Sequence, residues 1–254
     1  MIKLKSDEEI ECIRKAGEIV SKTLSLIGER IRAGMATYEL DKIAKDFIIK
    51  NKAKPAFKGY RGFPRNICVS IDSVIVHGIP DKKTFLKEGN IVGVDVGVEV
   101  GGYFADSAYT FSVGNVKGPA KKLIQVTKEA LYRGIDKAKA GSRLGDISFS
   151  IQDYVESRGF SVVRDFVGHG VGYELHEDPE VPNFGRPNSG VRLESGMVLA
   201  IEPMVNEGAY YTEVLDDGWT VVTKDGSLSC HFEHTICITN RGPDVLTKWQ
   251  KEMC

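Results

Sequence analysis

Four acidic residues lie in apolar or glycine-rich stretches whose pattern predicts β-strands. They are Asp95 in IVGVDVGVEV, Asp106 in YFADSAYTF, Glu202 in MVLAIEPMV and Glu233 in CHFEHTICI. A carboxylate in a half-buried strand costs free energy unless hydrogen bonds or an opposite charge compensate for its lost hydration. One such residue could be a satisfied structural carboxylate, but four indicate a site for divalent cations, which accept carboxylate and imidazole ligands. Two divalent ions would balance the four negative charges.

The first two carboxylates can meet on one face of a β-hairpin, which the alternating pattern predicts over residues 91–112. Glycines flank Asp95 on its own face of the strand, whereas the opposite face is a row of valines that helices could cover. A turn at 100–101 places Asp95 directly across from Asp106, and a turn at 101–102 places the two residues diagonally. Both registers keep the carboxylates within reach of a shared cation.

The strand predicted over residues 230–239 separates two histidines that flank Glu233 in the sequence. His231 shares the face of Glu233, whereas His234 lies on the opposite face among bulky apolar residues. We therefore expect His234 to be a packed, hydrogen-bonded core histidine and not a ligand. His231 could line the site, although an imidazole near the rim of a site is often only solvated.

Three further histidines lie in segments that we expect to be loops. His77 ends the apolar stretch in VIVHGIP, and His169 and His176 lie in VGHGVGYELHEDP. Glycines beside a histidine let the backbone approach closely and hold the imidazole in an unusual local geometry. The spacing differs from the HExxH zinc signature. Beside a cluster of four carboxylates, these three histidines are candidate site residues.

Capping and periodicity predict the elements that must position these residues. Ser6-Asp7-Glu8-Glu9 is a capping-box pattern, which predicts a helix that ends near Gly34. Further helices are expected at 37–51, 118–139 and 144–158. Extended segments are expected at 67–77 with a break near Asp72, and at 161–167, 197–206, 210–215, 219–223 and 230–239.

Two sequence matches at the same offset indicate an internal repeat. Gly34 corresponds to Gly141, and the segment 86–95 corresponds to 193–202, each shifted by 107 residues, so that the end of the second match aligns Asp95 with Glu202. We expect a single domain over residues 1–254 that consists of two helix–helix–sheet halves, roughly 1–112 and 113–254, related by a pseudo-twofold axis. The alternative is a chance similarity of two strands.

Composition gives a broad class. The net charge of −1 over 254 residues does not suggest a nucleic-acid or anionic-membrane partner. The N-terminal sequence MIKLKSDEEIECIRK lacks the apolar region of a signal peptide, and no apolar run is long enough to span a bilayer. The cysteines form no CxxC pair, which favours a reducing compartment and argues against a thiolate zinc site. They are Cys12, Cys68, Cys230, Cys237 and Cys254. We expect a soluble, cytoplasmic protein.

Taken together, these motifs resemble those of the type I methionine aminopeptidases, which belong to the pita-bread metallopeptidases. The resemblance covers nearly the whole chain and rests on VHGIP, VDVGVEVGGYFADSAYTF, GHGVGYELHEDP, GMVLAIEPM and DGWTVVTKDGSLSCHFEHT, with candidate ligands in the order Asp, Asp, His, Glu, Glu. It implies an α+β pita-bread fold, in which two pseudo-symmetric halves form a central curved antiparallel sheet covered by helices on its outer face.

The resemblance also implies a dinuclear site that holds two divalent metal ions, for which Co, Mn, Fe and Zn are all suitable. Asp95 and Asp106 would supply bridging or bidentate oxygens, His169 the nitrogen ligand, Glu202 a terminal ligand and Glu233 a bridge. The implied substrate-binding residues are His77, His176, Tyr60, Phe63, Cys68 and Trp219.

The activity that the resemblance implies is removal of N-terminal methionine from polypeptides with a small second residue. Two cations would generate hydroxide from a shared water, with Glu202 as the proton shuttle. His77 and His176 would contact the substrate amide and help to stabilise the tetrahedral intermediate. The implied partners are N-termini of nascent polypeptides, at the ribosome or away from it. The implied state is a monomer without nucleic-acid or membrane contacts.

Some positions depart from the pattern of the family. Phe57, Phe63 and Leu175 stand where members often carry cysteine, tyrosine and phenylalanine. The pocket wall therefore stays apolar, but the sequence does not determine the shape of the pocket. The short stretch between His176 and Glu202 has no room for the helical insertion of type II enzymes, which favours the type I form.

Three alternatives use the same scaffold. A prolidase or aminopeptidase P would act before or after proline, but those enzymes usually carry a large extra N-terminal domain. A non-catalytic relative that binds protein or RNA typically lacks part of the metal-ligand set, which is complete here. A metal-free hydrolase of the creatinase type would leave four clustered carboxylates to repel one another. Scattered, solvated acidic residues are a fourth possibility that the face analysis disfavours.

Overall fold

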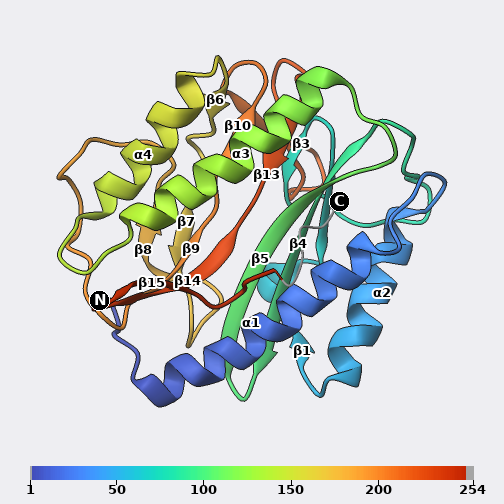
Figure 1. The fold of residues 1–254 in the computed structure, drawn as a ribbon. Helices are drawn as coiled ribbons and strands as arrows, with labels where there is room; N and C mark the ends of the chain where they lie inside the picture. Colours follow the sequence, from blue (N-terminus) through green and yellow to red (C-terminus); the bar gives the residue numbers. More distant parts are fainter. Residues whose placement is uncertain (1, 250–254) are drawn as a thin grey trace.

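The computed structural model describes residues 2–249, in which long helices lie across strands that pair only in antiparallel ladders (Figure 1). The helices are α1 (Asp7–Gly28), α2 (Thr37–Lys50), α3 (Gly118–Lys137) and α4 (Leu144–Glu156), together with a short 3-10 turn, η1 (Tyr60–Gly62). Figure 1 shows α1 and α3 crossing the near side of the strands, each accompanied by a second helix. This arrangement confirms the predicted α+β class.

Within residues 2–249, the strands pair in four antiparallel sheets. The first contains β1 (Lys54–Pro55), β4 (Ile91–Val100), β2 (Cys68–Ile71) and β5 (Tyr103–Ser112). The second contains β13 (Ser229–His231), β10 (Met204–Asn206) and β6 (Ser161–Val162). The third contains β11 (Thr212–Val214), β12 (Val221–Thr223) and β3 (Val74–Val76). The fourth contains β15 (Gly242–Val245), β14 (His234–Thr239), β9 (Val198–Ile201), β7 (Gly168–Gly170) and β8 (Glu177–Val181).

The first helix begins where its sequence predicts and ends earlier. The Ser6 amide donates to the Glu9 carboxylate at 2.8 Å and the Glu9 amide donates to the Ser6 hydroxyl at 3.3 Å, which completes the capping box. The predicted end near Gly34 is wrong, since α1 ends at Gly28. The chain turns before Gly34, which has a φ of 84° and donates its amide to the Leu86 carbonyl at 2.8 Å. That contact joins the chain after α1 to the segment that precedes β4.

The hairpin of β4 and β5 adopts the diagonal register. Val100 pairs with Tyr103, so the turn consists of Gly101 and Gly102, whose φ values of 60° and 88° favour glycine. Asp95 lies opposite Ala108, and Asp106 lies opposite Gly97, which keeps both carboxylates on one face. The valines of the other face are fully buried in the core that α1 covers. They are Val92, Val94, Val96 and Val98.

Equivalent contacts occur 107 residues apart in the chain. The Gly34 amide donates to Leu86, and the Gly141 amide donates to Leu193, each over 2.8 Å. Both glycines have positive φ, 84° and 90° respectively. Isolated bridges join Ala36 to Phe85 and Arg143 to Arg192. These matched contacts support the proposal that the domain consists of two similar halves.

The two proposed halves meet along a seam, which we define as the contact between β5 and residues 231–235. Side-chain hydroxyls make much of this contact. Ser107 donates to the Glu233 carbonyl at 2.5 Å, and Thr235 donates to the Asp106 carbonyl at 2.8 Å. These hydroxyls replace part of a regular ladder, and Thr235 also donates to Asp106 Oδ1 at 3.1 Å, so the seam reaches the Asp106 carboxylate.

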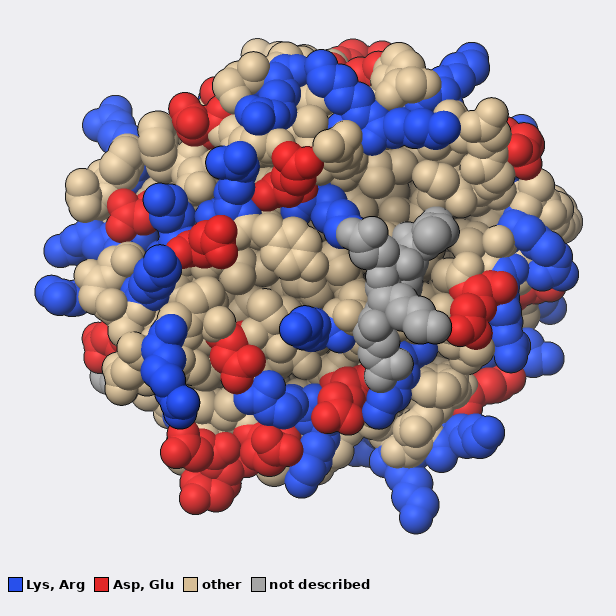
Figure 2. All heavy atoms as spheres, in the orientation of Figure 1, with Lys and Arg blue, Asp and Glu red and all other residues tan. Residues whose placement is uncertain are grey.

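Figure 2 shows basic and acidic side chains interspersed on the helix-covered face. Within residues 2–249, no helix has both the length and the apolar character needed to cross a membrane. Cys12, Cys68, Cys230 and Cys237 are free thiols, and Cys254 lies outside the described residues.

Candidate metal centre

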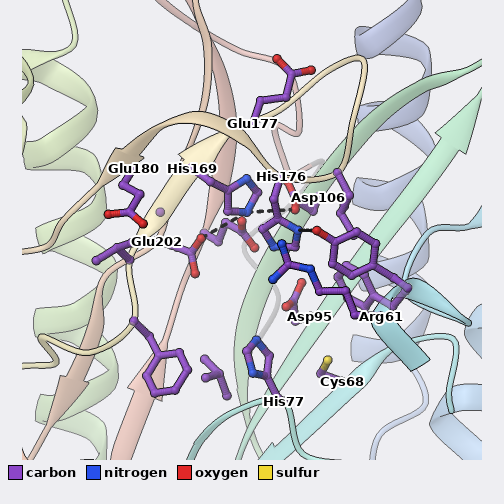
Figure 3. Close-up of a pocket in the computed structure, with 18 of the residues that line it drawn as sticks. Arg61, Cys68, His77, Asp95, Asp106, His169, His176, Glu177, Glu180 and Glu202 are labelled. Atoms are coloured by element: carbon purple, nitrogen blue, oxygen red, sulfur yellow. Dashed lines mark hydrogen bonds and ion pairs between the residues drawn. The ribbon is translucent and has the colours of Figure 1, made fainter. Parts of the chain in front are cut away.

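The predicted site residues line one cavity of about 720 Å³ (Figure 3). This volume is typical of pockets that bind small ligands. The cavity brings together the five predicted metal ligands, both predicted catalytic histidines and all predicted pocket residues. They are Asp95, Asp106, His169, Glu202, Glu233, His77, His176, Tyr60, Phe63, Cys68 and Trp219.

His169 reaches the cavity from a strand, so the predicted loop at this position is wrong. It is the middle residue of β7 and pairs with Ala200 of β9, which directs Glu202 toward the same cavity two residues later. A Cβ atom on Gly168 would lie 2.3 Å from the Ala200 carbonyl oxygen, and one on Gly170 would lie 2.2 Å from the Asp178 carbonyl oxygen. The flanking glycines therefore permit close strand contacts.

Glu233 lies in a bend, whereas the sequence predicted one strand over residues 230–239. The chain leaves β13 at His231 and enters β14 at His234, which belongs to a different ladder. Between them the Glu233 amide donates to the Ala108 carbonyl of β5 at 3.0 Å. This contact across the seam interrupts the strand and places the Glu233 carboxylate beside Asp106.

His234 is a core residue, as predicted. It is fully buried, its Nδ1 lies 3.0 Å from the Thr247 hydroxyl, and its ring centroid lies 4.0 Å from that of Trp249. It does not line the cavity. Burial lowers its pKa to about 3, so the imidazole is neutral.

The distances in the cluster suit a shared cation. The Nε2 atom of His169 lies 3.5 Å from Asp106 Oδ2 and 3.4 Å from Glu202 Oε1. Ligand atoms of Asp106, His169 and Glu233 lie within 4.8 Å of one another. The Nδ1 atom of His169 lies 3.0 Å from the Gly170 carbonyl, which fixes the proton on Nδ1 and turns the Nε2 lone pair toward the carboxylates.

The electrostatics of the cluster require a positive charge. Burial, followed by repulsion from neighbouring carboxylates, raises the pKa of Asp95, Glu202 and Glu233 well above the usual range. Burial also raises the pKa of Asp106 to about 6 and lowers that of His169 to about 4. Among the described residues, buried Oδ1 of Asp95 has no hydrogen-bond partner. A divalent cation would satisfy that oxygen and stabilise the ionised carboxylates, so the residues fit a metal centre.

His77 and His176 approach the cluster from two loops. His77 has a φ of 60°, and the next residue, Gly78, passes so close to Val69 that a Cβ atom would lie 2.1 Å from its carbonyl oxygen. Backbone in this region is unfavourable for a side chain other than glycine and often marks a functional position. Burial lowers the pKa of His77 to about 4. His176 is more exposed, but partial loss of hydration and then repulsion from His169 lower its pKa to about 3, so both rings are neutral.

An apolar pocket adjoins the carboxylates. Phe57, Phe63, Cys68 and Leu175 form a buried cluster, against which Tyr60 and Trp219 pack. The pocket contains all three departures from the family pattern. The ring of Phe57 lies against the bare backbone of Gly97, where a Cβ atom would be 2.5 Å from the ring. The hydroxyl of Tyr60 lies 2.9 Å from His176 Nδ1, which links the pocket wall to a candidate catalytic residue.

Sequence reasoning missed a buried ion pair that supports the His176 loop. Lys5 Nζ lies 2.6 Å from Glu177 Oε2, and their side chains are only 2% and 7% exposed. The other Glu177 oxygen accepts the amides of Tyr173 and Glu174 at 2.5 and 3.0 Å. The segment before α1 therefore holds the turn that carries His176. A lysine 172 residues away from its partner leaves no sequence pattern.

Comparisons with known proteins agree with this geometry. Residues 11–240 match the model of metallopeptidase family M24. A methionine aminopeptidase of Clostridium perfringens is 55% identical over 97% of this chain and 99% of its own length. The crystal structure of a methionine aminopeptidase from Thermotoga maritima has a TM-score of 0.96 at 49% identity, covering 98% of this chain and all of that one.

A prolidase from Pyrococcus furiosus is more distant. It has a TM-score of 0.80 at 25% identity, covering 98% of this chain and 66% of that one. The shared architecture is the pita-bread fold. With nearly full coverage and about half of its residues identical to those of its relatives, the chain belongs to metallopeptidase family M24 and, within it, to the methionine aminopeptidases.

Proposed function

We propose that the protein hydrolyses the first peptide bond of polypeptides and releases N-terminal methionine when the second residue is small. The observation that carries this proposal is the meeting of four carboxylates and one imidazole beside an apolar pocket in a single cavity. Its substrates would be N-termini of newly made polypeptides, which places its work in the cytoplasm.

The proposed metal set is two divalent ions. Asp95, Asp106, His169, Glu202 and Glu233 would hold them. Four carboxylates balance two double charges, and oxygen ligands with one imidazole suit Mn, Fe, Co or Zn. When bound, such ions lower the pKa of water and polarise a carbonyl group.

The chain's own residues would then move the proton and orient the substrate. Glu202 is the proposed proton shuttle, because its carboxylate lines the cavity and one of its oxygens lies 3.4 Å from His169 Nε2, where a cation would lie. His77 and His176 are neutral and can donate one N–H each to the substrate amide. Figure 3 shows His176 and His77 on opposite sides of Asp95, so a peptide bound at the carboxylates would meet both rings.

The apolar pocket would bind the methionine side chain. Cys68 is buried in its floor, and burial raises the pKa of the thiol well above its usual value, so the thiol is neutral. The rings of Phe63 and Trp219 meet edge to face, with ring centroids 5.2 Å apart. An unbranched, polarisable thioether packs favourably against aromatic rings and a thiol.

The test is hydrolysis of Met-Ala-Ser by metal-stripped protein, with each divalent ion added back separately. We expect no methionine release in chelator and recovery with at least one ion. A parallel panel of Xaa-Pro peptides tests the prolidase alternative, and Leu-Ala-Ser tests the side-chain pocket. Full activity in chelator, or faster cleavage of Xaa-Pro peptides than of Met-Ala-Ser, would contradict the proposal.

A further inference from the structure

Two imidazoles bracket the carboxylate of Glu202, one at each oxygen. His169 Nε2 lies 3.4 Å from Oε1, and His231 Nε2 lies 3.5 Å from Oε2. His231 lines the cavity and is only 4% exposed. Its Nε2 is buried and has no hydrogen-bond partner among the described residues. A buried ring nitrogen without a partner, directed at a carboxylate, requires an explanation.

The backbone of His231 is held on both sides, so its place beside Glu202 is built into the fold. In the ladder, His231 pairs with Met204 of β10, two residues after Glu202. On its other side, the hydroxyl of Thr110 accepts from the His231 amide at 3.2 Å and donates to its carbonyl at 2.7 Å. The strand pairing and the seam together fix the imidazole at this distance.

We propose that His231 is a positioning residue for Glu202, with its Nε2–H donating to Oε2. The neutral imidazole carries a single N–H, and placing it on Nε2 avoids opposing two lone pairs. The gap of 3.5 Å exceeds an ordinary N–H···O distance by a few tenths of an ångström. A small side-chain rotation closes this gap.

This hydrogen bond assigns different tasks to the two oxygens of Glu202. Oε1 faces the same space as His169 Nε2, where a cation would lie, while Oε2 is held by His231. Rotation of the carboxylate about its own axis would exchange the oxygens, and His231 prevents it. The kinetic consequence rests on the proposed function, but the geometry and its effect on cation affinity do not.

Three substitutions distinguish the loss of the hydrogen bond from the loss of a side chain that fills the space. His231→Gln places an amide nitrogen near the position of Nε2, His231→Asn places it near Nδ1, and His231→Leu fills the space without a donor. For Met-Ala-Ser, we expect His231→Gln to keep kcat within about 3-fold of the wild type, while Asn and Leu lower it roughly 10- to 100-fold. KM should change little, because His231 is not in the apolar pocket cluster.

Manganese binding to the metal-stripped proteins, measured by titration calorimetry, provides a readout independent of turnover. We expect the dissociation constant to rise roughly 10-fold or more in the Asn and Leu variants and to stay near the wild-type value in Gln. Equal losses in Gln and Asn, or wild-type behaviour in all three, would overturn the proposal. If the wild type binds manganese but releases no methionine, the proposed function fails while the Gln–Asn difference still decides the role of His231.

The tautomer can be measured without any variant at position 231. In nitrogen-15 spectra of histidine-labelled, metal-loaded wild-type protein, the ring of His231 should carry its proton on Nε2. A proton on Nδ1 would overturn the proposal, even if the three variants were too unstable to assay.

Discussion

Two carboxylates that each have a buried oxygen have opposite surroundings in this molecule. Asp41 of α2 is 3% exposed and accepts hydrogen bonds from the Asn66 amide and side chain, each at 2.7 Å, and from the Ile67 amide at 3.3 Å. Asp95 of β4 has a buried oxygen with no partner in the described structure. Burial of an acidic residue therefore does not by itself indicate a metal site. The number of N–H groups that reach the carboxylate makes the distinction.

The buried histidines show the same contrast. His234 has the Thr247 hydroxyl at one ring nitrogen and packs on Trp249, so its surroundings are complete. His169 has a backbone partner at Nδ1 only, and its Nε2 faces carboxylates. The chain itself supplies the hydrogen-bond partners of Asp41 and His234. The carboxylates of the cavity instead favour a partner from outside the chain.

Replacing Glu202 with alanine is the strongest challenge to this contrast. The change removes the proposed proton shuttle and should lower kcat for Met-Ala-Ser about 1000-fold or more. It also removes one of several repelling charges, so urea unfolding of the metal-free protein should show stability equal to or above that of the wild type. Turnover near the wild-type rate would refute the shuttle role. Marked destabilisation would show that Glu202, like Asp41, is a structural carboxylate.

His234→Ala tests the buried histidine whose hydrogen bond is made within the chain. Loss of a fully buried ring that packs on Trp249 and bonds to Thr247 should reduce the free energy of unfolding by about 3 kcal/mol. Metal analysis of the folded variant should give the wild-type number of ions per chain, because His234 does not line the cavity. A well-folded variant that has lost metal would show that the assignment is wrong.

Asp41→Asn is the corresponding change at the carboxylate whose hydrogen-bond partners all belong to the chain. The new amide group would oppose the Asn66 side-chain donor, and we expect a loss of about 2 kcal/mol in urea unfolding. Methionine release per metal-loaded, folded molecule should remain at the wild-type level. A variant with normal stability would indicate that Asp41 is not held by its N–H partners.

The pH dependence of cation binding gives the finest test. Burial raises the pKa of Asp106 to about 6 and those of Asp95, Glu202 and Glu233 well above the usual range, so an incoming cation must displace protons. Affinity should therefore rise between pH 6 and 7 by about tenfold, or 1.4 kcal/mol, for each proton released. His169 adds nothing in this range because its pKa is about 4. Calorimetry in two buffers of different ionisation enthalpy counts the protons released. A cation affinity that does not change with pH would contradict the raised pKa values of the carboxylates.

The sequence predicted the parts of the site that depend on local patterns. The hairpin of β4 and β5 follows from period-two alternation around glycines, and it places Asp95 and Asp106 together. The separation of Glu233 from His234 follows from their adjacent positions in an extended segment. The convergence of all predicted site residues on one cavity rests on the family resemblance as well as on these patterns.

The features that the sequence did not predict depend on contacts between distant segments. The glycines beside His169 suggested a loop, but they permit close approach to Ala200 and Asp178. The bend at Glu233 exists because its amide reaches Ala108 across the seam. Neither contact leaves a periodic signal in the chain, and the same is true of the approach of His231 to Glu202.

The seam between β5 and residues 231–235 also governs when the protein can become competent. Asp95 and Asp106 belong to the earlier part of the chain, and His169, Glu202 and Glu233 belong to the later part. Because the hydroxyls of Ser107 and Thr235 join the two parts, the centre exists only after the last ligand has docked. A growing chain on the ribosome would thus carry an incomplete set of the proposed ligands until residue 233 has emerged, and the enzyme would stay inert until its own folding is finished.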